Sequence, residues 1–158
     1  MMDRICLSLT LPLLLGAVQP DLPATWKVIE FKEGRFSVRM APDHTSKKQS
    51  VTRAGDPLEV TTIVGAGRKD TLFVVSYCDY SDADLKKGPI DMRLDYARDG
   101  AVASADGMLR NEKKITLDGH PGRDIVIAKD GNIVVRTRIY LVKNRLYQVM
   151  TLGKVVPE

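Results

Sequence analysis

The sequence predicts an α+β domain in which an antiparallel β-sheet packs against helix. Most of the chain alternates apolar and polar residues between short turns rich in Gly, Pro, Asp and Asn, which is typical of antiparallel strands. One central segment changes to the 3.6-residue period of an amphipathic helix. The length of 158 residues fits one domain of ordinary size.

Composition excludes several classes of protein. Hydrophobic residues make up 44% and charged residues 28% of the chain, close to globular averages, which excludes a disordered or collagen-like protein. The net charge of +4 is well below that of a dedicated nucleic-acid binder, so we expect no nucleic-acid partner. No apolar run reaches the roughly 20 residues of a membrane span.

Residues 1–19 have the pattern of a signal peptide. An almost wholly apolar run from Ile5 to Val18 follows the terminal amine and Arg4. We therefore predict export to the periplasm or the extracellular space, with residues 20–25 as a linker and 26–158 as a single domain. The alternative is a buried N-terminal strand or helix. Cleavage would leave Cys78 alone, and hence no internal disulfide.

The first half of the domain is predicted to be an antiparallel meander of five strands. The first two strands are joined by a short connection containing Gly34, and Gly, Pro and Asp supply the later turns. The strands are predicted at residues 26–31, 35–40, 47–53, 58–64 and 71–80.

A helix of about 15 residues is predicted next. Pro89 suits its first turn, where the missing N–H is not needed, and Gly107 suits its end. Its apolar stripe consists of Ile90, Leu94, Ala97, Ala101 and Val102.

Four strands follow the helix, separated by tight turns. They are predicted at residues 109–117, 122–128, 133–142 and 146–152.

Several turns and strand starts together resemble those of PsbP-like bacterial proteins, over about residues 26–152. The runs that carry the resemblance are Glu33-Gly34-Arg35-Phe36-Ser37-Val38, Val75-Ser76-Tyr77, Leu94-Asp95-Tyr96-Ala97-Arg98-Asp99-Gly100, Leu117-Asp118-Gly119-His120-Pro121-Gly122-Arg123-Asp124 and Asn144-Arg145-Leu146-Tyr147-Gln148-Val149. The resemblance implies the α/β/α sandwich of the Mog/PsbP type and a role in docking on other proteins.

The chain departs from this family at its C-terminus. PsbP-like proteins run on into a further helix and strand, whereas this sequence stops at Glu158. We therefore expect a domain that lacks the C-terminal helix and strand. An edge left uncovered there would invite pairing with another chain, including a second copy.

The residues that carry catalytic or metal chemistry are few. His44, His120 and Cys78 have no recognised catalytic or metal-ligand spacing, so we predict no catalytic residue, metal or cofactor. The acidic run at residues 79–84 is the best candidate for calcium, with a solvated loop before the helix as the alternative.

A basic and aromatic face is the best candidate for a binding surface. Alternation places Arg136, Arg138 and Tyr140 on one face of a strand, and Arg145 and Tyr147 can join them across the following turn. Guanidinium and phenol groups on a sheet suit an anionic protein, glycan or lipid headgroup. The alternative is a solvated charged face, or Arg and Tyr stems that cover the sheet.

These patterns predict a non-enzymatic exported domain that docks on a protein or a cell-envelope component. One alternative is a hydrolase-like enzyme whose site is assembled from dispersed Asp, Glu, His and Tyr residues. Another is a small-ligand or calcium-binding protein.

Overall fold

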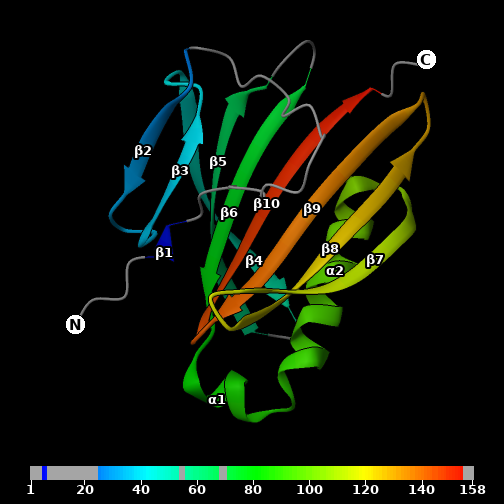
Figure 1. The fold of residues 1–158 in the computed structure, drawn as a ribbon. Coiled ribbons are helices and arrows are strands. Elements are labelled where there is room, and N and C mark those ends of the chain that lie inside the picture. Colours follow the sequence, from blue (N-terminus) through cyan, green and yellow to red (C-terminus); the bar gives the residue numbers. More distant parts are fainter. Residues whose placement is uncertain (1–4, 7–24, 54–55, 68–70, 155–158) are drawn as a thin grey trace.

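The computed structural model describes residues 5–6, 25–53, 56–67 and 71–154 (Figure 1). The predicted signal peptide and linker fall almost entirely outside this part of the chain. The exception within the signal peptide is a two-residue strand, β1 (Ile5–Cys6), which pairs in parallel with β3 (Phe36–Met40).

A seven-stranded antiparallel sheet forms the body of the molecule, in the spatial order β4-β5-β6-β10-β9-β8-β7. Its last strand along the chain, β10, pairs with both β6 and β9 and so joins the two halves of the sequence. The strands are β4 (His44–Arg53), β5 (Asp56–Ala66), β6 (Leu72–Asp79), β7 (Met108–Leu117), β8 (His120–Lys129), β9 (Ile133–Val142) and β10 (Arg145–Lys154).

One face of this sheet carries helix α2 (Ile90–Ala105), which packs against β8 and β9 (Figure 1). The predicted helix is therefore confirmed, with Leu94 and Ala97 buried. A shorter helix, α1 (Asp82–Lys86), precedes it in the segment where a loop was predicted. Ser81 caps α1 by accepting a hydrogen bond from the backbone N–H of Asp84.

The end of α2 differs from the prediction in one detail. Asp106, not Gly107, adopts the left-handed conformation, with φ of 50°. Gly107 is needed for a different reason, since a Cβ there would lie 2.7 Å from the carbonyl oxygen of Ala128.

The opposite face of the large sheet is covered in part by a small sheet of β1, β3 and β2 (Lys27–Phe31). The predicted first hairpin is thus present, but it leaves the meander and packs across it (Figure 1). Phe36, Val38 and Met40 of β3 form a core with Val75 and Tyr147 of the large sheet.

The predicted α+β class and the α/β/α sandwich of the Mog/PsbP type are both wrong. The described chain is mostly strand, with two short helices, and a small sheet stands where the sandwich requires a second helical layer. The physical reason is that the central strands bury side chains on both faces. The sequence offers one amphipathic helix to cover them, so the apolar hairpin covers the second face.

The expectation of an uncovered C-terminal edge is also wrong. β10 lies inside the sheet, and β4 and β7 are the outermost strands. The C-terminal strand is protected because its hydrogen-bonding groups are paired on both sides. Neither described helix has the length and hydropathy needed to cross a membrane.

Candidate functional site

Strand register places all five predicted binding residues on one face of the sheet, the face that carries the small sheet. Tyr147 lies directly opposite Tyr140, while Arg138 lies opposite Val149 and Arg136 opposite Thr151. Residues that lie opposite one another in antiparallel strands share a face.

Burial divides these five residues into two groups. Tyr140 and Tyr147 lie within the core under the small sheet. Burial raises the pKa of both phenols. The Tyr147 hydroxyl donates a hydrogen bond of 2.8 Å to the carbonyl oxygen of Gly34, and so holds the turn between β2 and β3 against the large sheet.

Arg145 is buried and holds the same turn. Its guanidinium hydrogen-bonds both carboxylate oxygens of Asp79, donates to the carbonyl oxygen of Glu33 at 2.7 Å, and lies over the ring of Tyr77. The hydrogen bond from Arg145 lowers the pKa of Asp79 below its ordinary value. Arg145 and Tyr147 thus hold the small sheet against the large sheet through buried hydrogen bonds.

Arg136 and Arg138 lie on the part of the face that the small sheet's core does not reach. Arg136 is exposed, and no ion pair is found for it within the described part of the chain. Arg138 is half-exposed and pairs with Asp124 of β8 at 3.2 Å. Lys113 of β7 lies opposite Asp124 on the same face and is exposed. Three cations therefore face one carboxylate.

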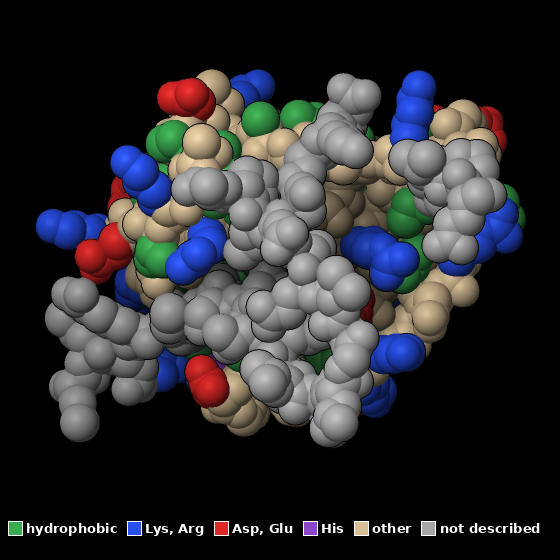
Figure 2. Space-filling model, turned by 45° about the horizontal axis from the view of Figure 1, so that its top comes forward, with side chains coloured by type: hydrophobic (Ala, Val, Ile, Leu, Met, Phe, Trp, Pro, Cys, Tyr) green, Lys and Arg blue, Asp and Glu red, His purple; other side chains and the backbone are tan. Residues whose placement is uncertain are grey.

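We call this region the open surface. It covers the ends of β7, β8 and β9 nearest the turn between β8 and β9, and consists of Met108, Lys113, Asp124, Val126, Ala128, Val134, Arg136 and Arg138. Figure 2 shows Lys and Arg side chains over this half of the molecule, on the right of the view, with hydrophobic side chains among them. Chemically, it suits an anionic partner.

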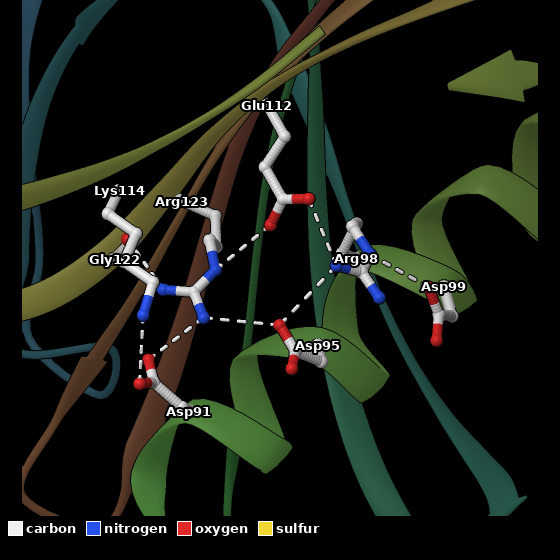
Figure 3. Close-up of polar contacts among 8 residues, drawn as sticks. All are labelled: Asp91, Asp95, Arg98, Asp99, Glu112, Lys114, Gly122 and Arg123. Carbon is white, nitrogen blue, oxygen red and sulfur yellow. Dashed lines mark hydrogen bonds and ion pairs between the residues drawn. The ribbon is translucent and has the colours of Figure 1, made fainter. Parts of the chain in front are cut away.

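A second polar cluster lies on the other face, between α2 and β7–β8 (Figure 3). Its centre is Arg123, whose side chain is 3% exposed. The guanidinium donates to Asp91 at 2.8 Å and to Asp95 at 3.1 Å, and its Nε forms an ion pair of 3.0 Å with Glu112. Arg98 bridges Asp95 and Glu112 at the far side of the cluster.

Each carboxylate of this cluster lies close to a cation of the same cluster. Asp91 accepts hydrogen bonds from Arg123 and Lys114. Both lower its pKa, and the bond from Arg123 has the larger effect. A hollow of about 380 Å³ opens beside the cluster and is lined by the same charged residues. Because each of these carboxylates already faces a cation, the cluster serves to attach α2 to the sheet.

Sequence reasoning missed this cluster in part. The helix period places Asp91, Asp95 and Arg98 away from the apolar stripe of α2, so a charged flank was predictable. Arg123 gave no signal, because Asp91 and Asp95 lie 32 and 28 residues away and meet it only through the packing of α2 on β8.

The other sequence candidates for chemistry are separated in space. His44 lies in β4 and His120 in β8, at opposite sides of the large sheet. Nδ1 of His44 lies 2.9 Å from the carbonyl oxygen of Pro42, and its ring contacts Phe31. Cys78 is buried in the apolar core that also contains Leu94 and Ala97 of α2.

Two of the three carboxylates in the acidic segment at residues 79–84 are paired with cations of the chain itself. Asp79 pairs with Arg145. Asp84 accepts hydrogen bonds from Lys87 and Ser81, which lower its pKa to about 2. Within the described residues, no group of three or more His, Cys, Asp or Glu residues is placed to hold a metal ion.

Comparison of this chain with models of known protein families, with curated proteins and with solved structures gives no match. Function therefore has to be argued from the site itself.

Proposed function

We propose that this chain is an exported, non-enzymatic domain that docks on an acidic surface of a protein or a cell-envelope component. The signal-like pattern of residues 1–19 supports export. The observation that carries the docking proposal is the exposed guanidinium of Arg136, flanked by Arg138 and Lys113 on the open surface.

Charge and chemistry favour an anionic partner. Arg presents a planar fork of donors that matches carboxylates and phosphates, and it is enriched at protein interfaces. Asp124 neutralises one of the three cations, so an excess of positive charge faces solvent. Such an excess speeds association with an oppositely charged surface and loses its effect as salt is added.

The first test is the binding of a fluorescent polyglutamate peptide to the full chain, followed by anisotropy at low and at physiological salt. We expect Arg136→Glu to weaken binding about tenfold, because it replaces attraction with repulsion at the centre of the surface. Lys47→Glu is the matched control, since Lys47 is an exposed cation on β4 and the change in net charge is the same.

Equal weakening by both substitutions would mean that net charge alone governs binding, and would contradict a specific docking surface. Phosphatidylglycerol vesicles form a second arm of the experiment. Binding to vesicles but not to the peptide, with the same sensitivity to Arg136→Glu, would identify the envelope lipid as the partner. No binding in either arm would reject the proposed function.

A further inference from the structure

The open surface has an apolar end as well as a basic one. Met108, Ala128 and Val134 lie opposite one another across β7, β8 and β9, and Val126 follows in the next row, opposite Arg136. Met108 is 62% exposed and the other three are half-buried. Among the described residues, these four belong to neither apolar core of the molecule.

Side chains that lie opposite one another across β7, β8 and β9 form rows on this face. The composition of these rows changes from apolar to charged along the strands. The row that contains Ala128 is apolar, the row that contains Arg136 is mixed, and the next row joins Lys113, Asp124 and Arg138. A partner that matches this surface needs an apolar side and an acidic side. Separated apolar and acidic sides on one short element are the property of an amphipathic helix.

The same strands already hold a helix on their other face. α2 packs against β8 and β9 there and has 16 residues. At about 1.5 Å per residue it is roughly 24 Å long, while a strand of 10 residues such as β9 spans roughly 33 Å. Of this length the open surface occupies the part of β9 from Val134 to Arg138, roughly 13 Å, which is enough for about two and a half turns of a helix.

The edges of the sheet are less suited to a partner than its face, because a partner strand would have to pair with β4 or β7. The outermost strands carry lysines, namely Lys47 and Lys48 on β4 and Lys113 and Lys114 on β7, and β7 is also bulged between Leu109 and Asn111. Lysines and bulges on edge strands oppose pairing with another chain. This leaves the face of the sheet, and not its edge, as the place for a partner.

We propose that the open surface receives an acidic amphipathic helix of a partner protein, opposite α2. The apolar side of that helix packs on Met108, Val126 and Val134, and its carboxylates pair with Arg136 and Lys113. The inference rests on the proposed function and specifies the kind of partner. Helices bound in apolar grooves are an established mode of recognition.

The experiment compares two labelled peptides of about 16 residues, the length of α2, with the same Leu and Glu content. One peptide has the helical period and the other is scrambled. We expect the full chain to bind the periodic peptide at least about tenfold more tightly, a difference of about 1.4 kcal/mol. The helical circular-dichroism signal of the peptide should rise on binding.

Two double variants locate the contact. Val126→Ser with Val134→Ser should abolish the preference for the periodic peptide. Val28→Ser with Val51→Ser should leave it unchanged, because these exposed valines lie on β2 and β4. The comparison of the two peptides on the wild-type chain stands even if a variant fails to fold.

The outcomes separate this inference from the function on which it rests. Equal affinity for the two peptides, still sensitive to Arg136→Glu, would overturn the helix proposal and leave anionic docking intact. Binding to phosphatidylglycerol vesicles without binding to either peptide would also overturn it. Failure of both peptides, of polyglutamate and of the vesicles would reject both proposals.

Discussion

Individual side chains on the predicted binding face play two different roles. Alternation placed Arg136 and Arg145 on one face, and the strand register agrees. The small sheet then buries Arg145 and Tyr147 and leaves Arg136 exposed. A period of two residues tells which face a side chain occupies, but it carries no information on what covers that face.

Two glycines give a prediction at this scale. A Cβ on Gly34 would lie 2.4 Å from a ring carbon of Phe36 and 3.1 Å from one of Tyr77, so Gly34→Ala overpacks the contact between the sheets. We expect a loss of about 1–3 kcal/mol in the free energy of unfolding, measured by urea denaturation. Gly100→Ala is the control, because Gly100 lies inside α2 with nothing within 4 Å.

Gly100→Ala should raise stability by about 0.5–1 kcal/mol, since alanine is the better helix former. Similar losses in both variants would show that Gly34 is not held at a tight contact.

Thr137 gives a second prediction. Its side chain is fully buried beneath α2, and its hydroxyl makes no hydrogen bond within the described part of the chain. Thr137→Val removes an unpaired polar group at nearly constant volume, so we expect stability to be unchanged or to rise by about 1 kcal/mol. Val135→Thr, at a buried position of the same strand face, should instead cost about 1–3 kcal/mol. Thermal unfolding of the two variants measures the contrast, and destabilisation by Thr137→Val would show that the hydroxyl has a partner.

At the scale of elements, the attachment of α2 depends on both apolar and charged contacts. Leu94 and Ala97 supply the apolar contact with β8 and β9, and Arg123 supplies the charged one. Helix and strand positions were predictable because periodicity and turn chemistry act over a few residues. The predicted strand at residues 133–142, for example, agrees with β9. Helix α1 was missed because five residues are too few to show a period.

The charged attachment can be tested by comparing a buried cation with an exposed one. Arg123→Met removes hydrogen bonds to Asp91 and Asp95 and leaves carboxylates facing one another, so we expect a loss of about 2–3 kcal/mol. Lys114→Met removes one ion pair to Asp91 whose partners are both more than half exposed, and should cost less than about 1 kcal/mol. Urea unfolding measures both losses, and equal losses would mean that Arg123 adds no more than a surface pair.

At the scale of the whole molecule, the position of β10 determines which strands lie at the edges of the large sheet. β10 pairs with β6 on one side and with β9 on the other, and so joins the two halves of the sheet. The edge strands are therefore β4 and β7. Both outermost strands carry lysines, which discourages pairing between copies.

We therefore predict that the full chain is a monomer at micromolar concentration, as measured by light scattering. Thr45→Val with Lys47→Val removes the charge from an exposed edge and should produce association that increases with concentration. A wild-type dimer would contradict the view that these edges are protected, and would turn attention to contacts between copies.

The sequence by itself determined the local features of this protein. Nearly all the strands, the helix, the turns and the shared face of Arg136 and Arg138 follow from periodicity and from the conformations that Gly, Pro and Asn favour. The tertiary structure alone decided that the hairpin of β2 and β3 covers a face of the sheet, that β10 lies inside it, and that Arg123 meets Asp91 and Asp95. These features depend on burial and on pairing between residues far apart in the chain. No local pattern encodes such pairing, because its free energy comes from surfaces that meet only after the chain has folded.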